Sequence, residues 1–596
     1  MRLEHHRLGR LRPLFLFGWS LLVLTVGFRD VSARVTSPHR MWTAGDLTRF
    51  DSSWLHVKFV EGSEPLIAGL NFRPTTPELI AVNARLGALE VREIRPSFPI
   101  ERSEARAWKA VGESRRSEIG PDLSLWYDLR VGGGRAGVAA AVNSLMESDG
   151  VEIAHPAAIP GLPSAALAAP ATDTPDFAPL QLYLGATPIG LDAPTAWSFP
   201  GGRGEGVKFI DVELAWTEDH EDFDADRLFY VGGATQNTVY EPHGTAVLGE
   251  IIGRHNGYGV DGFAPHVDWG VVAVTEAEWP SVPHRFFEAM ENLGPGDCWL
   301  IELQMYPPGR DATPMEYLQI NYDVIWTSSW SRGVVCVEAG ANGGQDLDHP
   351  QWEGAFDRSI RDSGAILVAA GTPQGRMAEF FTNYGSRMDL HAWGTQIVTT
   401  GYGDLYSGGT LQTRYSAGFS GTSGASPMIA GAVLCLEGIA RAANGAPLSP
   451  EAVRALLRET GIPALDPVKQ IGPRPDLAAA AVAILDPVSI TGPPEIASIA
   501  MSWAAPNPFR DATELRWSSL GAGRASASAS VSVRILDASG RTIRRLIPDS
   551  RAVPAAGIVW DGRDEHGRPV ANGVYLARFE QSGPSRRSPL RLIRVR

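Results

Sequence analysis

The sequence predicts an α/β fold with a doubly wound parallel sheet, preceded by a small α+β domain and followed by a β-sandwich. Short, continuously apolar runs divided by helical patterns fill residues 180–487, as parallel strands buried between helix layers require. Residues 34–160 alternate strand and helix patterns, and residues 498–596 contain only strand and turn patterns. A chain of 596 residues is too long for one hydrophobic core, so separate domains are expected.

Residues 1–33 have the pattern of a secretory signal peptide. Basic and polar residues up to Arg12 precede an apolar run from about Leu14 to Phe28, and small residues end the segment at Ala33. The run is short for a membrane span, and we expect no other stretch of the chain to approach spanning length. The pattern therefore predicts an exported protein without a membrane span in its mature form, and the alternative is a retained membrane anchor.

Composition also marks the boundaries between the expected domains. Within residues 34–160, Leu55 to Phe59 alternate as a half-buried strand does, and Thr76-Pro77-Glu78 is typical of a helix N-terminus. Residues 161–179 are rich in Pro and Ala and are expected to form a linker. In the α/β region, functional side chains are expected at the carboxyl ends of the strands.

The overall composition argues against two classes of function. A formal net charge of −14 disfavours a nucleic-acid-binding surface, which needs a basic face. The 13 histidines form no H-E-x-x-H motif and no Cys/His cluster, so metal catalysis has no support. The three cysteines, Cys298, Cys336 and Cys435, lie in apolar runs and are expected to be buried core residues.

Three segments of the α/β region carry the side chains that nucleophilic catalysis needs. Asp211 directly follows the apolar run Val207–Ile210, which is expected to place it at the carboxyl edge of the sheet. His243 opens a helix, and Gly244 after it permits a close backbone approach. Ser423 lies at a loop-to-helix junction, where free N–H groups and the helix dipole favour a developing oxyanion. Each feature alone also has a structural explanation, and for Ser423 that explanation is helix capping.

Taken together, the three segments resemble the subtilisin-like protease family, the subtilases. The order Asp, His, Ser, with H-G-T at 243–245 and G-T-S-G-A-S-P at 421–427, carries the resemblance, which covers most of residues 180–485. It implies that Ser423 attacks the scissile carbonyl, that His243 takes and returns the proton, and that Asp211 fixes the imidazole tautomer. It also implies Asn342 as the side-chain donor of the oxyanion hole.

The chain departs from the family pattern at two places. The family has a small residue and Gly after its Asp, whereas Val212 and Glu213 follow Asp211; we expect a structural role for Glu213. The family has Gly before the oxyanion Asn, whereas Ala341 stands there. Sedolisin acid proteases are disfavoured, because they lack the His of H-G-T. The expected function is a secreted serine endopeptidase, and the alternative is a catalytically silent protease fold acting as a surface-display or binding scaffold.

The resemblance extends to the flanking segments. Residues 34–160 occupy the position of a subtilase propeptide, which is removed on maturation. The segments Pro506–Phe509 and Asn572–Tyr575 resemble the Ig-like module of flagellar hook-capping proteins and the sorting modules of bacterial secreted enzymes. This implies a location outside the cell or on a bacterial cell surface, peptide or protein substrates, and secretion or cell-surface machinery as a partner. No cofactor is implied for the chemistry; structural calcium is common in the family, and no loop here commits to it.

Overall fold

A computed structural model shows the architecture that these patterns predict. It describes residues 41–116, 119–160, 174–233, 239–274, 282–485, 498–505, 507, 509–520, 531–537, 541–546, 557–581 and 590–595. The expected signal peptide lies outside the described residues, and so do residues 161–173 of the expected linker. Residues 174–179 of that linker lie along the α/β domain, where the Phe177 N–H donates to the Gly259 carbonyl at 2.7 Å.

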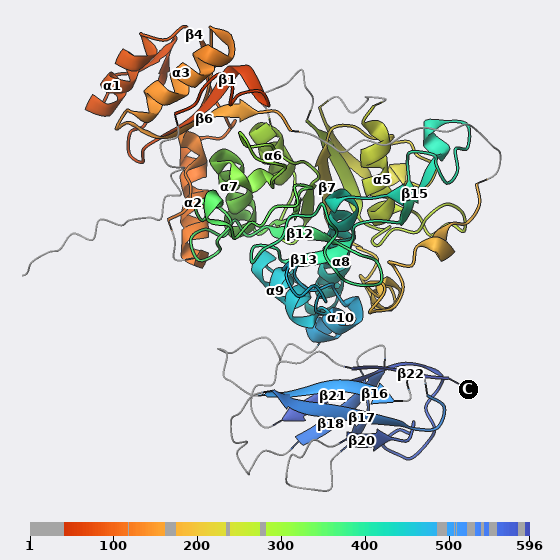
Figure 1. The fold of residues 1–596 in the computed structure, drawn as a ribbon. Coiled ribbons are helices and arrows are strands. Elements are labelled where there is room, and N and C mark those ends of the chain that lie inside the picture. Colours follow the sequence, from red (N-terminus) through yellow and green to blue (C-terminus); the bar gives the residue numbers. More distant parts are fainter. Residues whose placement is uncertain are drawn as a thin grey trace, which may run out of the picture. The chain divides into compact units, whose positions relative to one another are not determined.

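The N-terminal domain is an antiparallel sheet with helices, which confirms the α+β prediction. Its strand order is β4-β5-β1-β6 (Figure 1). The Thr76 hydroxyl accepts from the Leu79 N–H at 3.3 Å and caps the first helix, as the sequence predicts. The elements are β1 (Phe50–Phe59), β2 (Ile67–Ala68), β3 (Asn71–Phe72), α1 (Pro77–Leu86), β4 (Val91–Pro96), α2 (Arg102–Arg116), β5 (Trp126–Val131), α3 (Gly134–Met146) and β6 (Val151–Ala158).

The central domain is built on a seven-stranded sheet of order β13-β12-β11-β10-β7-β9-β8, in which every neighbouring pair is parallel. This confirms the doubly wound α/β prediction. Its strands are β7 (Lys208–Glu213), β8 (Leu228–Gly232), β9 (Asp268–Ala273), β10 (Cys298–Ile301), β11 (Val335–Ala339), β12 (Ile366–Gly371) and β13 (Leu390–Trp393). Its helices are α4 (Ala193–Ala196), α5 (Glu241–Ile252), α6 (Val282–Glu291), α7 (Gln319–Trp326), α8 (Thr422–Asn444), α9 (Pro450–Thr460) and α10 (Leu477–Leu485), and a hairpin joins β14 (Ile397–Thr400) to β15 (Tyr415–Phe419).

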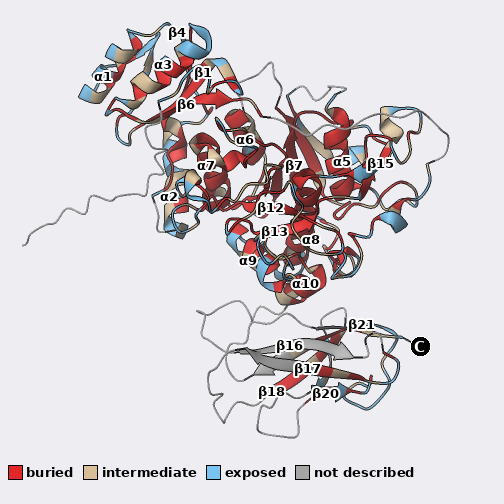
Figure 2. Ribbon diagram, in the orientation of Figure 1, coloured by how far each residue is buried: buried red, intermediate tan, exposed pale blue. Residues whose placement is uncertain are grey.

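The two faces of this sheet pack against different helices. Phe209 and Leu300 join the hydrophobic core that includes α5 and α8, whereas Ile210, Val212 and Ile301 join the core that includes α6 and α7. Successive side chains of a strand alternate between faces. Asp211 and Glu213 therefore lie on the α5/α8 face, where helices and strands are buried almost throughout (Figure 2).

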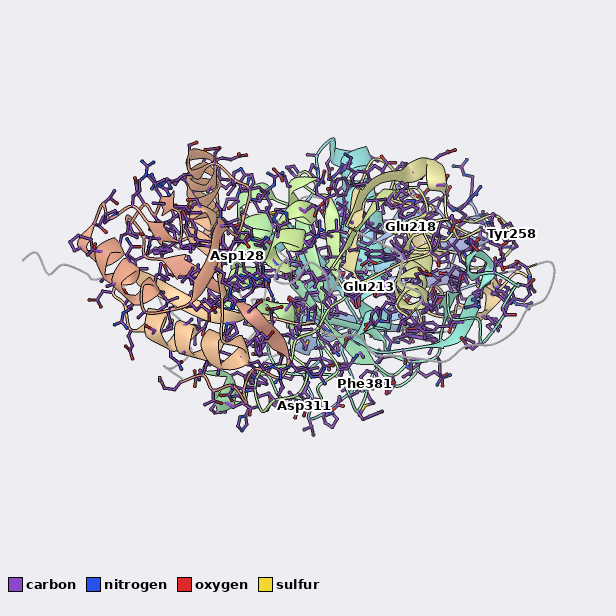
Figure 3. The ribbon with its side chains drawn as sticks, turned by 90° about the horizontal axis from the view of Figure 1, so that it is seen from above. Asp128, Glu213, Glu218, Tyr258, Asp311 and Phe381 are labelled. Carbon is purple, nitrogen blue, oxygen red and sulfur yellow. The ribbon has the colours of Figure 1, made fainter. Side chains whose placement is uncertain are left out.

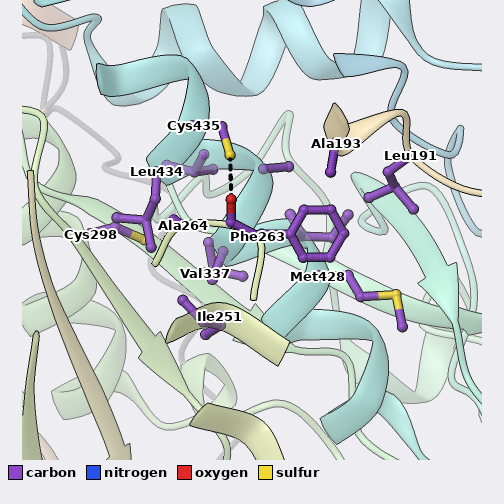
Figure 4. Close-up of a cluster of buried hydrophobic side chains, with 14 of the residues drawn as sticks. Leu191, Ala193, Ile251, Phe263, Ala264, Cys298, Val337, Met428, Leu434 and Cys435 are labelled. Carbon is purple, nitrogen blue, oxygen red and sulfur yellow. Dashed lines mark hydrogen bonds between the residues drawn. The ribbon is translucent and has the colours of Figure 1, made fainter. Parts of the chain in front are cut away.

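Helix α8 forms the middle of that core. By length and composition it is the one helix in the described part of the chain that could cross a membrane, but that apolar stretch is entirely buried, so it is a core helix. From the sequence we predict no stretch of spanning length beyond the N-terminal run, and helix α8 shows that this prediction is wrong for length and composition. Apolar side chains of α8 surround Phe263, whose carbonyl accepts from Cys435 Sγ at 3.2 Å (Figure 4). All three cysteines are free and buried, as predicted.

The N-terminal domain contacts the central domain through buried polar and aromatic side chains. Lys58 Nζ donates to Asp323 Oδ2 at 2.9 Å, and the Trp126 indole N–H donates to the same oxygen at 2.9 Å. The rings of Phe98 and Phe287 stack with their centroids 5.4 Å apart. These contacts hold the N-terminal sheet against α6 and α7, on the side of the central sheet opposite to Asp211 and Glu213.

The C-terminal segment forms two antiparallel sheets, which confirms the β-sandwich prediction. The strand orders are β16-β17-β20 and β19-β18-β21-β22. Trp560 is fully buried among the apolar side chains of this module. The strands are β16 (Ser498–Ala505), β17 (Thr513–Leu520), β18 (Val531–Asp537), β19 (Thr542–Leu546), β20 (Gly557–Trp560), β21 (Gly573–Gln581) and β22 (Leu590–Arg594).

Candidate active site

The imidazole of His243 is hydrogen-bonded to Glu213. His243 lies in the first turn of α5, and Glu213 is the last residue of β7, at the carboxyl edge of the sheet. His243 Nδ1 contacts Glu213 Oε1, and both side chains are buried. Figure 3 labels Glu213 within the α/β domain. A carboxylate on Nδ1 fixes the imidazole tautomer and leaves Nε2 as the basic nitrogen.

Asp211, which the sequence predicts as the partner of His243, has a different hydrogen bond. Its Oδ2 accepts from the Trp216 indole N–H at 2.7 Å, and its Oδ1 has no partner among the described residues. The strand that was expected to end at Ile210 continues for three further residues and ends at Glu213. Because Asp211 and Glu213 are two residues apart, both side chains point to the face of His243.

The glycine of the H-G-T motif makes room for Glu213. A Cβ atom at Gly244 would lie 2.6 Å from Glu213 Oε2 and 2.4 Å from the Ala215 carbonyl oxygen. Only a residue without a side chain allows the helix to approach the strand end so closely. The close approach that the sequence predicts at Gly244 is therefore an approach to the carboxyl group that contacts His243.

Ser423 and Asn342 meet at the N-terminus of α8. Ser423 is the second residue of the helix, and its backbone N–H has no acceptor among the described residues. Asn342 Oδ1 accepts from the Thr422 N–H at 2.9 Å and from the Thr422 hydroxyl at 3.1 Å. These bonds fix the amide group and leave its Nδ2 as a donor. Ala341, in place of the family's Gly, has a φ of 67°, in the left-handed region that favours glycine.

Among the described residues no hydrogen bond joins Ser423 to His243, and the two are related through their neighbours. The pKa of Glu302 responds both to the Ser423 hydroxyl and to the charge of Glu213, which contacts His243. His243 Nε2 is buried and has no partner among the described residues. The ring of Phe419, four residues before Ser423, lies 5.4 Å from the imidazole ring. Catalytic hydrogen bonds are often long in a free enzyme and shorten when substrate binds.

Four buried carboxyl groups act on one another at this site, and Glu213 among them contacts His243: Asp211, Glu213, Glu250 and Glu302. Burial raises the pKa of each well above its ordinary value, and the charge of Glu213 further raises that of Asp211. No Lys or Arg is among the described residues whose charge shifts the pKa of these four groups. Burial also lowers the pKa of His243 to about 4, against the charge of Asp211.

Two members of this cluster, Glu250 and Glu302, were not singled out from the sequence. Both interrupt apolar runs, in Gly249-Glu250-Ile251-Ile252 and Leu300-Ile301-Glu302-Leu303. A carboxyl group is rarely buried without a partner, because its desolvation is costly. An acidic residue inside a run that is expected to form a buried element is therefore the signal that could have found them.

No metal centre accompanies these side chains in the described part of the chain. No group of three or more His, Cys, Asp or Glu side chains there is arranged to hold a metal ion. The arrangement of a serine at a helix N-terminus, an imidazole and a carboxyl group is that of nucleophilic acyl transfer, which needs no cofactor.

Comparisons with known proteins identify the same segments. Subtilisin Savinase from Lederbergia lenta is 28% identical over 248 residues, covering 41% of this chain and 81% of that protein. The alkaline protease of Alkalihalobacillus alcalophilus is 27% identical over 248 residues, covering 41% of this chain and 58% of that protein. Minor extracellular protease Epr of Bacillus subtilis (strain 168) is 27% identical over 187 residues, covering 31% of this chain and 25% of that protein. This chain thus covers less than two thirds of the length of two of these relatives.

Family comparisons divide the chain in the way the fold does. Residues 208–473 match the subtilase family, and this range contains Glu213, His243, Asn342 and Ser423. Residues 517–584, within the C-terminal sandwich, match the FlgD Ig-like domain. Residues 208–473 are therefore similar to the subtilase family, and a segment similar to the FlgD Ig-like domain follows them in the chain.

Proposed function

We propose that this chain is a secreted serine endopeptidase in which Ser423 is the nucleophile, His243 the general base and Glu213 the carboxylate that orients His243. The observation that carries the proposal is the contact between Glu213 Oε1 and His243 Nδ1, which leaves Nε2 unpartnered in a buried site beside α8. In this proposal Glu213 takes the role that the sequence order assigns to Asp211. Asp211 supports the site through Trp216.

The reaction is an acyl transfer in two steps. Ser423 Oγ bonds to the substrate carbonyl carbon while its proton moves to His243 Nε2, and that proton then passes to the leaving amine as the peptide bond breaks. Water next bonds to the acyl carbon while giving a proton to Nε2. That proton passes to Ser423 Oγ as the ester bond breaks and the carboxylic acid leaves, which restores Ser423. His243 acts as a base only when neutral, and the low pKa that burial gives it keeps it neutral above about pH 4.

The negative charge on the substrate oxygen needs donors that are already in place. The Ser423 backbone N–H and Asn342 Nδ2 are suited to this role, because neither is used by another acceptor among the described residues. The N-terminal end of α8 adds its positive dipole. Removal of one such donor typically costs about 100- to 1000-fold in rate.

Labelling with a fluorophosphonate, which reacts with activated serines, tests the proposal. We expect peptide mapping to place the label on Ser423 and the label to be lost in His243→Ala. A processed, folded protein that takes no label, or takes it on another serine, would refute the assignment. It would then favour the alternative, a catalytically silent protease fold that serves as a binding or display scaffold.

The flanking domains fit an exported enzyme with a removable N-terminal domain. An extracellular relative, Epr, and the expected signal peptide support export to the cell exterior or the bacterial cell surface. The N-terminal domain occupies the propeptide position, and a Pro/Ala-rich segment joins it to the peptidase domain. We further propose that the Ig-like module contacts secretion or cell-surface machinery, on the basis of its match to the FlgD Ig-like domain.

A further inference from the structure

Glu302 is a buried carboxyl group that the proposed reaction does not use. It directly follows β10, and its backbone N–H donates to the Val212 carbonyl at 3.2 Å, beside the end of β7. Leu300 faces the α5/α8 core, so Glu302, two residues later, faces the same side as Glu213. The residue is 1% exposed, and its Oε2 has no partner among the described residues.

Its other oxygen contacts the helix that carries the nucleophile. Glu302 Oε1 is within hydrogen-bonding distance of Ser426 Oγ, and Ser426 lies three residues after Ser423, on the same face of α8. Ser426 Oγ also lies 2.6 Å from the Thr422 carbonyl oxygen, one helical turn earlier. A carbonyl oxygen only accepts, and a serine hydroxyl has one hydrogen to donate. When Ser426 donates to Thr422, the hydrogen between Ser426 and Glu302 has to come from Glu302.

We propose that Glu302 is a positioning residue that stays protonated and donates a hydrogen bond to Ser426, which fixes the first turn of α8 and with it Ser423. This inference rests on the proposed function. The bonded chain runs from Glu302 through Ser426 to the Thr422 carbonyl, and the Thr422 N–H and hydroxyl bind Asn342. One neutral acid thus supports both the nucleophile and the oxyanion donor.

The groups around Glu302 favour its neutral form. Asp211 and Glu213 face it from β7, and Glu250 faces it from α5. The imidazole of His243 contacts Glu213. On β11 the position next in register is Ala339, which has no charge. Burial and the charges of Glu213 and Asp211 raise the pKa of Glu302, whereas its contacts with the hydroxyl groups of Ser426 and Ser423 act in the opposite direction. Together these effects hold the pKa of Glu302 well above the ordinary value for a glutamate.

Two substitutions of Glu302 distinguish a hydrogen-bond donor to Ser426 from a carboxyl group that only supports the fold. Glu302→Leu removes the donor and a costly buried polar group together, so we expect kcat to fall about 100-fold with KM little changed, while resistance to urea does not fall. Glu302→Gln restores a donor that cannot ionise. We expect it to recover kcat to within about tenfold of wild type and to remove the loss of kcat that wild type shows as Glu302 ionises in alkali.

Glu338 supplies the matched control. It is a fully buried glutamate on the adjacent strand, β11, paired in register with Ile301. Its neighbour Cys336, two residues before it, belongs to the core on the α6/α7 face, so Glu338 points away from Ser423. Burial raises its pKa to about 8. Glu338→Gln should keep the kcat and the alkaline loss of wild type.

Three outcomes would overturn the proposal. The first is a Glu302→Gln enzyme as inactive as Glu302→Leu at every pH, because the ionised carboxylate would then be the required form. The second is an equal loss of the alkaline limb in Glu338→Gln. The third is independent of catalysis: infrared difference spectra between wild type and Glu302→Gln at neutral pH should contain the carbonyl band of a protonated carboxyl group, and its absence contradicts the inference. A wild type that neither cleaves peptides nor takes the fluorophosphonate label refutes the proposed function alone.

Discussion

Replacement of Glu213 by Gln tests which carboxyl group serves His243. Gln keeps the size of Glu and an oxygen that can accept from Nδ1, but it removes the negative charge. When His243 takes the serine proton, the positive imidazolium on the other side of the hydrogen bond favours the ionised form of Glu213 against the burial that raises its pKa. A carboxylate at a hydrogen-bond distance of about 3 Å in an effective dielectric constant of about 20 then stabilises the imidazolium by about 5 kcal/mol. This corresponds to about 10⁴-fold in rate, which is the loss expected in kcat/KM for Glu213→Gln.

The matched variant is Asp211→Asn. Asn retains an oxygen for the Trp216 indole N–H, and Asp211 acts on His243 through its charge without a bond to it, so we expect a smaller loss than for Glu213→Gln. Gly244→Ala, whose Cβ would lie 2.6 Å from Glu213 Oε2, should lower kcat/KM by displacing Glu213. Initial rates on a chromogenic peptide, with circular dichroism as the control for folding, measure all three. The reverse order, a large loss for Asp211→Asn and a small one for Glu213→Gln, would show that Asp211 is the catalytic carboxylate.

Three further predictions address the oxyanion, stability and maturation. Asn342→Ala should lower kcat about 100- to 1000-fold and leave KM nearly unchanged in the same peptide assay; an unchanged kcat would move the donor role elsewhere. Burial raises the pKa values of Glu338 and Glu437 to about 8, so the folded state holds protons that the unfolded state has released above about pH 4.5. Each such group makes the unfolding free energy decrease by about 1.4 kcal/mol per pH unit. Buried neutral histidines oppose this decrease only below about pH 6.5, where the unfolded chain takes up protons on its histidines. Urea unfolding at several pH values above about 6.5 measures the slope, and a rise in the unfolding free energy with pH would contradict it. Expression of Ser423→Ala in a protease-deficient host should accumulate precursor, whereas N-terminal sequencing of wild type should find a start between residues 157 and 179; equal processing of both would exclude self-cleavage.

The fold class followed from the sequence because its signals are local. Continuously apolar runs such as Val207–Ile210 became strands of the parallel sheet, and Thr76 capped its helix as predicted. Which carboxyl group contacts His243 could not be predicted in this way, because the end of a strand is decided by pairing with its neighbours. Pairing with β9 extends to Glu213, two residues past Asp211. Both carboxyl groups therefore lie on the same face of the strand, and the sequence pattern cannot show which of them contacts His243.

The remaining parts of the site depend on contacts between distant segments. The sequence identifies Ser423 and Asn342 as candidates, but the bond that joins Asn342 to the turn before Ser423 exists only in the folded domain. The left-handed conformation of Ala341 explains why glycine is the usual residue there, and the sequence alone marks it only as a departure. Glu302 was not identified from the sequence because the residue that it contacts, Ser426, lies 124 positions later in the chain.

These separations have a consequence for the order of events in folding. The contacts of the site join residues 30, 80 and 124 positions apart, in the pairs Glu213–His243, Asn342–Thr422 and Glu302–Ser426. Each requires the closure of a long loop, and long-range pairing of this kind forms late and slowly. A nascent or half-folded chain therefore has no assembled nucleophile. In the proposed enzyme, hydrolytic activity therefore requires a complete sheet, so a chain that is still folding cannot cleave its own unfolded neighbours.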